Sequence, residues 1–353
     1  MYEISSDILA LTSEAVVIVR GGLITFANAA AKALIGADCI GKRPGIYFPP
    51  EILGAQASSF VADAQLGERR CILRVSKSAD MQIFFLSKPA DVPVQLNDAL
   101  IYSLRSSLMS MGTAADICRA QAEELEDEEL LFGVSSLTQS CHRLMRLVSN
   151  ITVVKDMLNG GISFCPTRVD IAALFSGYVD ALRTFCPEVE FSLGFSAGIY
   201  ACVDAALAGQ LFLNLISNCL QHAKGLTRVS INLLDVGEDI ILSIGDNGCG
   251  IPEEELHMVF SRYLHPFDLS TLSGGVGMGL TVVRGIAQRH GGTLLLESRA
   301  GCGTSVRASF KKNLHTAQLC APTCAEDVSF TKPVLTALSE YLPAQCYVEK
   351  FLD

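Results

Sequence analysis

The chain has 353 residues, of which half are hydrophobic and 18% are charged. That length allows two or three domains with sizeable cores, and the composition excludes an intrinsically disordered chain. The net charge of −10 gives no electrostatic reason to expect nucleic acid or an anionic membrane surface as a partner. The 13 cysteines are dispersed and form no CxxC pair, which favours small buried thiols in a reducing cytoplasm.

The first region, residues 1–92, is predicted to form a small α+β domain. Apolar runs flank the turn Gly21-Gly22, a polar residue then precedes an alanine-rich stretch, and a second pair of apolar runs follows. The elements expected are strands at Ala15–Arg20 and Leu23–Phe26, a helix at Ala27–Ile35 with Asn28 near its start, and strands at Arg70–Val75 and Met81–Leu86. Lys88–Pro93 carries two prolines and is a plausible domain boundary.

The stretch Ile18–Ala31 resembles the start of a PAS domain, with strand, turn, strand, Asn28 and then a helix. The resemblance implies small-ligand sensing, partner docking or dimerisation. A histidine-ligated haem is excluded because residues 1–95 contain no histidine. The N-terminus shows neither a signal peptide nor an apolar run long enough to span a bilayer, so we expect a cytoplasmic protein without a membrane span.

Residues 95–158 are predicted to form a helical hairpin. Apolar residues recur at spacings of three and four in both halves, on either side of the acidic run Glu123–Glu129, which suits an exposed tip. The predicted apolar positions are Leu96, Leu100, Leu104, Leu108, Met111, Ala115 and Cys118, then Leu130, Val134, Leu137, Cys141, Leu144, Val148, Ile151, Val154 and Leu158. Two helices bury little surface alone, so we expect a homodimer in which two hairpins form a four-helix bundle.

Residues 166–312 are predicted to be an α/β domain, followed by a tail at 313–353. The expected helices are Ile171–Phe185, Ala205–Ala223 and Leu280–His290, and the expected strands are Val189–Phe195, Arg228–Leu234, Asp239–Gly245, Thr293–Ser298 and Thr304–Phe310. The tail contains a short predicted helix, Pro333–Tyr341, and no recognisable chemical motif.

The first of three motifs in the α/β region is Asn214-Leu-Ile-Ser-Asn218, within a predicted helix. Residues four apart share one helix face, and asparagine is a mediocre helix former. An amide oxygen is a suitable ligand for Mg²⁺, which keeps its other positions for water and phosphate. Taken alone, two solvent-facing asparagines would explain the pattern equally well.

The second motif, Asp246-Asn-Gly-Cys-Gly-Ile251, directly follows an apolar strand. A carboxylate at a strand end can accept a hydrogen bond from the exocyclic amine of adenine, and Gly248 and Gly250 allow the backbone to turn and to approach a base closely. An ordinary Asp/Gly turn is the alternative.

The third motif, Gly274–Leu280, runs into a predicted helix. Its alternating glycines could cradle phosphates with backbone N–H groups at the start of that helix. It is neither a Walker A loop nor a dinucleotide fingerprint, since the following residues and the preceding topology differ. A flexible surface loop is the alternative.

Together, in this order and spacing, the motifs resemble the N, G1 and G2 boxes of sensor histidine kinases and of the wider GHKL ATPase superfamily. Val259–Tyr263 is similar to the F box between them. The resemblance implies an α/β sandwich that binds ATP and Mg²⁺. It implies that Asn218 holds Mg²⁺ and that Asn214 lies near the phosphates and the metal-bound water. It also implies that Asp246 binds adenine, in a pocket shaped by Gly248 and Gly250. The residues that would border the nucleotide are Gly275, Gly277, Gly279 and Leu280, and residues 261–274 would form a lid. Gln221 stands where the family often has a basic residue.

The same resemblance places the hairpin where such kinases carry their phosphoacceptor helix, but the acceptor histidine is missing. The stretch Tyr102–Leu108 matches the family pattern at Leu104, Arg105 and Leu108, while Tyr102 stands at the acceptor position. A phenol is almost wholly protonated at neutral pH and needs a base, unlike imidazole. Other acceptors considered are His142, Ser106 and Ser107.

The sequence therefore predicts a multidomain α+β protein of the sensor histidine kinase family. The family implies an ATP-dependent phosphotransferase of a two-component pathway, with a response regulator as partner. A non-catalytic ATP-binding regulator is the main alternative, because of Tyr102. A GHKL-type serine kinase or ATPase is a third.

Overall fold

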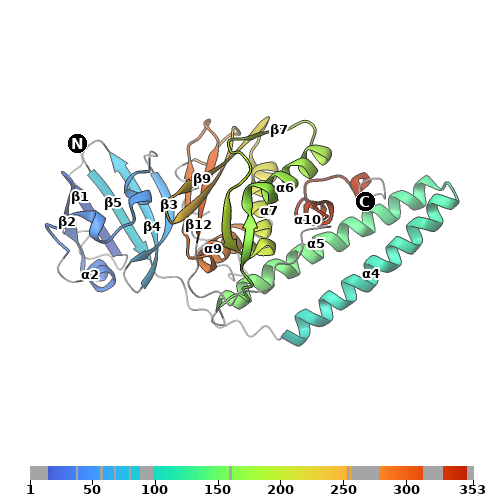
Figure 1. Ribbon diagram of the computed structural model, residues 1–353, viewed down its shortest axis with the longest axis horizontal. Helices are drawn as coiled ribbons and strands as arrows, with labels where there is room; N and C mark the ends of the chain where they lie inside the picture. Colours follow the sequence, from blue (N-terminus) through green and yellow to red (C-terminus); the bar gives the residue numbers. More distant parts are fainter. Residues whose placement is uncertain are drawn as a thin grey trace.

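The computed structural model describes residues 15–36, 39–55, 59–66, 69–78, 81–87, 98–158, 161–252, 255, 278–312 and 329–347. An N-terminal sheet lies at one end of the molecule, an α/β layer structure occupies the middle, and a long helical hairpin extends to the other end (Figure 1).

The N-terminal part is an antiparallel sheet in the order β2-β1-β5-β4-β3. Its elements are β1 (Ala15–Arg20), β2 (Leu23–Ala27), α2 (Ala29–Ile35), η1 (Pro44–Ile46), α3 (Pro50–Leu53), β3 (Ser59–Leu66), β4 (Arg69–Ser78) and β5 (Met81–Ser87). Asn28 caps α2, since its Oδ1 accepts hydrogen bonds from the backbone N–H of Ala31 and of Val16 at 3.0 and 3.1 Å. The predicted strands and helix are thus confirmed, whereas β3 was not predicted and the boundary at Lys88–Pro93 lies outside the described residues.

The hairpin consists of α4 (Asp98–Glu124) and α5 (Glu128–Leu158), so the predicted pair of helices is confirmed. The predicted apolar seam is wrong at most of its described positions on α4, and it is wrong on α5 at Leu130, Leu137 and Leu144, which are exposed. The side chains buried on α4 include Ile101, Leu108, Ala115 and Ala122, spaced by sevens, whereas the predicted positions Leu100, Leu104, Met111 and Cys118 are exposed. The helix has two apolar faces, and one of them faces solvent in the single chain.

The central part has five strands in the order β11-β12-β10-β9-β7, with α6, α7 and α9 beside them. The bounds are β6 (Thr167–Asp170), α6 (Ile171–Phe185), β7 (Glu190–Leu193), β8 (Tyr200–Val203), α7 (Ala205–His222), β9 (Arg228–Val236), β10 (Asp239–Asp246), α9 (Gly279–Arg289), β11 (Leu294–Ser298) and β12 (Thr304–Lys311). All the predicted elements of this part are present. The short pair β6–β8 was not predicted, because each strand has only four residues.

The two sheets join edge to edge, which the sequence did not indicate. β3 pairs antiparallel with β11, for example Val61 with Leu296, so ten strands form one continuous sheet. Leu295 belongs to the N-terminal apolar core although it lies on a strand of the central part. The pairing leaves neither sheet with an open edge at this junction.

The chain beyond the central part returns to the hairpin. It forms α10 (Thr331–Ala337) and η3 (Ala344–Tyr347), so the helix predicted at Pro333–Tyr341 starts earlier and ends sooner. Among the helices described, none is both long and apolar enough to cross a bilayer. Several cysteines are buried free thiols, as predicted, whereas Cys165 takes part in a disulfide.

Candidate nucleotide-binding site

The first wall of the site is α7, which runs through the core of the central part. Asp204 caps it by accepting a hydrogen bond from the N–H of Leu207 at 3.1 Å. Most of its residues are apolar and buried. Asn214 is only 5% exposed, and its amide N–H₂ donates to the carbonyl oxygen of Gln210 at 2.9 Å. That bond fixes the side chain and leaves the amide oxygen able to accept a hydrogen bond or to coordinate a metal ion.

The second wall is the beginning of α9. Gly279 is its first residue, and the side chain of the N-cap residue, Met278, makes no capping hydrogen bond to the helix. A Cβ atom at Gly279 would lie 3.3 Å from Oδ1 of Asn218 and 3.6 Å from Oδ1 of Asn214. Both asparagine oxygens therefore lie beside the same helix N-terminus. Such an end favours an anion, because its N–H groups lack partners and the helix dipole is positive there.

The third wall is the end of β10. The Oδ1 atom of Asp246 accepts hydrogen bonds from the N–H groups of Gly248 and Thr304 at 2.9 and 3.2 Å. Asp246 also lies against Cys219, the residue after Asn218; burial raises the pKa of that thiol, and the neighbouring carboxylate raises it further. These contacts bring Asp246 and the two asparagines to one side of α7.

The glycines after Asp246 are required by close packing. A Cβ at Gly248 would collide with Ala223 at the end of α7. Gly250 has φ +65°, and a Cβ there would collide with the backbone carbonyl of Arg299. The loop is thereby held between α7 and the β11–β12 turn. Gly275, Gly277, the F-box segment 259–263 and the lid 261–274 lie outside the described residues, whereas Leu280 follows Gly279 as a partly buried residue of α9.

Within the described part of the chain, no three His, Cys, Asp or Glu side chains gather as a metal site. The oxygen donors that do converge are the two amides. Hard oxygen donors beside a helix N-terminus fit an Mg²⁺ ion that is bound mainly by phosphate and water. Together with the carboxylate of Asp246 at the end of β10, these groups have the chemistry that a nucleoside triphosphate with Mg²⁺ requires. The fold and the site are those of a nucleotide-binding α/β sandwich.

Comparison with known families agrees with this class. Residues 203–314 match the family described as "Histidine kinase-, DNA gyrase B-, and HSP90-like ATPase". The matched region contains α7, β10 and α9, and so every wall of the site. The chain therefore carries an ATP-binding domain of this family, and it is homologous to sensor histidine kinases.

Two curated relatives illustrate that homology. The signal transduction histidine-protein kinase/phosphatase MprB of Mycolicibacterium smegmatis is 26% identical over 245 residues, which is 67% of this chain and 49% of MprB. The signal transduction histidine-protein kinase AfsQ2 of Streptomyces coelicolor is 29% identical over 206 residues, 56% of this chain and 38% of AfsQ2. The matched parts span about half or less of these relatives. Among solved structures, the Acinetobacter baumannii histidine kinase AdeS aligns with 18% identity and a TM-score of 0.43, over 61% of this chain and 98% of AdeS.

The structure does not bring Tyr102 to the nucleotide site. Its side chain is 77% exposed on α4. The neighbouring hydroxyl of Ser107 donates to the backbone oxygen of Ser103 at 2.9 Å, and Arg105 donates to Thr152 of α5 at 3.1 Å. His142 is only partly exposed, and its Nδ1 lies 2.7 Å from the hydroxyl of Thr336 on α10.

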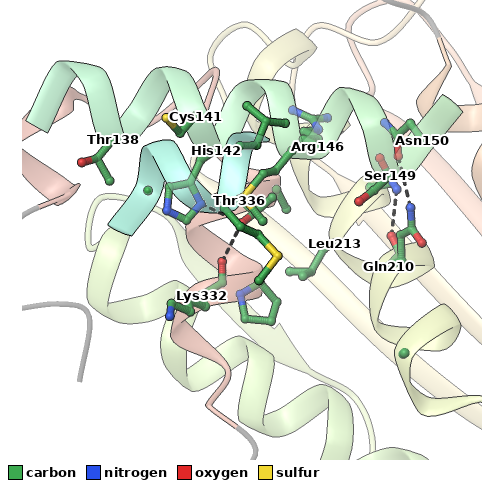
Figure 2. A pocket seen from close by; sticks show the side chains of 18 of the residues that line it. Thr138, Cys141, His142, Arg146, Ser149, Asn150, Gln210, Leu213, Lys332 and Thr336 are labelled. Atoms are coloured by element: carbon green, nitrogen blue, oxygen red, sulfur yellow. Dashed lines mark hydrogen bonds between the residues drawn. The ribbon is translucent and has the colours of Figure 1, made fainter. Parts of the chain in front are cut away.

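A cavity of about 630 Å³ connects the hairpin to Asn214, and no pattern in the sequence predicted it. Figure 2 shows Asn150 and Gln210 at one end and His142 and Thr336 at the other. Asn150 accepts a hydrogen bond from Gln210, one helical turn before Asn214, at 3.3 Å. Tyr102 does not line the cavity. Gln210 was missed because an isolated glutamine on a helix has no signature of its own.

Proposed function

We propose that this chain is a sensor histidine kinase-type protein of a two-component pathway, which binds MgATP and passes the γ-phosphoryl group toward a response regulator. The observation that carries the proposal is the convergence of Asn214 and Asn218 on the uncapped N-terminus of α9. Its relatives MprB and AfsQ2 are named as histidine-protein kinases. The comparisons give no support to a non-catalytic role.

In this proposal each residue has one task. Asn218 would hold Mg²⁺, which would supply positive charge to the phosphates, and Asn214 would lie beside it, near the phosphates and the metal-bound water. Asp246 accepts a hydrogen bond from adenine, and the N–H groups that begin at Gly279 bind the phosphates, with Leu280, Gly275 and Gly277 beside them. Catalysis of phosphoryl transfer depends chiefly on positioning and electrostatic stabilisation, so a site without a nucleophile of its own is sufficient.

Tyr102 occupies the acceptor position in the proposal. No acidic residue stands beside it in the sequence, since Ser103 follows. A phenol without a neighbouring base transfers phosphate slowly at neutral pH. We therefore expect a weak label on the chain that survives acid, in contrast to the acid-labile phosphoramidate of histidine.

We further propose that the protein is a cytoplasmic homodimer with a PAS-like N-terminal domain. The dimer is supported by the exposed apolar side chains of the hairpin, among them Leu104, Met109 and Met111 on α4 and Phe132 and Leu137 on α5. Such residues are stabilised when a second hairpin covers them in a four-helix bundle. The five-stranded sheet with Asn28 capping α2 supports the PAS-like assignment.

The test is incubation with γ-labelled ATP and Mg²⁺, followed by acid and base treatment, with and without receiver-domain proteins encoded beside the gene. We expect label on the chain or on such a receiver, and none with the Asn218→Ala variant. Absence of label on the chain and on every receiver offered would overturn the proposed activity.

A further inference from the structure

The tail segment 329–347 lies between the hairpin and the central part of the molecule. In Figure 1, α10 lies next to α7 on one side and α5 on the other, near the C-terminal end of the drawn ribbon. This segment, which we call the brace, is neither part of the nucleotide site nor of the matched family region, which ends at residue 314.

The brace is held to the central part by apolar packing. Val334, Leu335 and Leu338 are fully buried in the same core cluster as the residues of α6 and α7. The ring of Phe330 meets Tyr178 of α6 edge to face, with centroids 4.9 Å apart, and fills the space that the missing side chain of Gly177 leaves. Burial of several large apolar side chains makes this attachment firm.

The brace is held to α5 by one ring contact, between Tyr347 and His142 with centroids 5.2 Å apart, and by a set of polar contacts that includes His142 with Thr336. The amide of Gln139 donates to the carbonyl oxygens of Ser339 and Leu342 at 3.1 and 2.6 Å, and Arg143 donates to Ser339 at 2.8 Å. These carbonyls follow the end of α10, where backbone oxygens lack helical partners. The ion pair Arg146–Glu340, at 3.7 Å, adds to this side. Hydrogen bonds within a protein can be exchanged for hydrogen bonds to water at little net cost, so the α5 attachment is the one expected to open first.

The position of this attachment determines how the hairpin is held. The other contacts of α5 with the central part lie toward its C-terminal end, including Asn150 with Gln210 and Met157 against Gly285. Arg143 and Met157 are separated by about 20 Å of helix at 1.5 Å per residue. A helix attached only near one end can pivot about that attachment. A second attachment at that distance fixes the orientation of α5 relative to the central part.

We propose that residues 329–347 form an internal brace that locks α5 onto the ATP-binding domain, and that its release from α5 frees the domain to move along the hairpin. The brace stays on the domain through its apolar side and detaches from α5 at Gln139, His142 and Arg143. In the locked state Asn214 lines the cavity beside α5, whereas Tyr102 of the same chain does not. Under the proposed function, which this consequence rests on, release of the brace changes the position of the nucleotide site relative to Tyr102.

The test uses the full chain and the double variant Gln139→Ala/Arg143→Ala. The matched control is Ser136→Ala/Ser140→Ala, which truncates two α5 side chains at the same spacing of four and removes no apolar residue of the hairpin. Hydrogen exchange is followed in residues 139–146, in the brace and in the core of α7, and small-angle scattering reports the overall shape. Neither readout needs phosphoryl transfer, so failure of the proposed kinase activity would leave this test intact.

We expect exchange in residues 139–146 and in the polar side of the brace to rise about tenfold or more in the double variant. The core of α7 should stay protected, and the scattering should show a broader distance distribution. The brace is overturned if the double variant exchanges like the control. It is equally overturned if α7 loses protection together with the brace, since the segment would then be an inseparable part of the core.

Discussion

Asn214 on α7 and Tyr102 on α4 have contrasting surroundings. Asn214 is 5% exposed, and its amide donates a hydrogen bond to the carbonyl of Gln210. Its oxygen lies beside Gly279, as does that of Asn218. Tyr102, in contrast, is 77% exposed on α4. The nucleotide side is preorganised within one domain, because three of its elements pack into one core. The predicted acceptor side is an exposed surface position on another helix. The proposed binding of ATP and the proposed acceptance of phosphate can therefore be tested separately.

The largest effect is expected on dimerisation, from changes at the exposed apolar face of the hairpin. This face is part of neither the nucleotide site nor the predicted acceptor position. Replacement of Leu104 and Met111 by glutamate should raise the dimer dissociation constant by about a thousandfold or more, since each buried apolar side chain contributes about 1.5–3 kcal/mol. Sedimentation velocity measures it. The control Leu234→Glu/Val236→Glu changes two exposed residues of β9 and should leave the dimer intact. Equal dissociation of both variants, or of neither, contradicts a hairpin dimer.

The next effect concerns the preorganised side. Asp246→Asn should weaken MgATP binding by about 10–100-fold, because a charged acceptor of the adenine amine becomes neutral. The amide oxygen can still accept from Gly248 and Thr304, so the fold should persist. Asp239→Asn, at the other end of β10, removes an ion pair with Lys311 and should leave affinity unchanged. Calorimetric titration that shows wild-type affinity for Asp246→Asn would remove this residue from the site.

The residues of the nucleotide-binding side could be predicted from the sequence, whereas much of the packing around the hairpin could not. Asn214, Asn218, Asp246 and Gly279 could be identified because they lie in motifs with fixed spacing, and the structure brings them together. The burial of Ile101 in place of Leu100 could not be predicted. A helix with two apolar faces has apolar residues all round, so its sequence does not indicate which face is buried. The brace and the β3–β11 pairing could not be predicted either. Both join residues that are far apart in the chain, and neither has a local signature.

A third prediction concerns His142, beneath the brace. The hydroxyl of Thr336 donates its proton to the carbonyl of Lys332 at 2.9 Å, so Nδ1 of His142 donates to Thr336. Burial, aided by the positive charge of Lys332 and opposed by Asp116, lowers the pKa of His142 to about 4 from 6.5. The folded state thus favours the neutral ring. The contribution of the neutral His142 ring to the free energy of unfolding is complete above pH 6.5 and is lost as the pH falls toward 4.

In the His142→Gln variant, the fall in unfolding free energy between pH 7 and pH 4 should be smaller than in wild type by on the order of 2 kcal/mol. Glutamine retains a donor for Thr336 and does not titrate. Urea denaturation at a series of pH values provides the two slopes. Burial also lowers the pKa of His290, so part of the slope should remain in the variant. Identical slopes would mean that His142 is protonated as readily in the fold as in the unfolded chain.

The smallest effect is expected at Tyr102, and it tests the separation of the two sides directly. Because the hydroxyl is exposed and remote from the cavity, Tyr102→Phe should change the affinity for MgATP by less than about twofold and the stability by no more than about 0.5 kcal/mol. It should, however, abolish any acid-stable label that the chain acquires from γ-labelled ATP. Label that persists in Tyr102→Phe would move the acceptor to another residue, and an altered ATP affinity would show that the two sides are coupled.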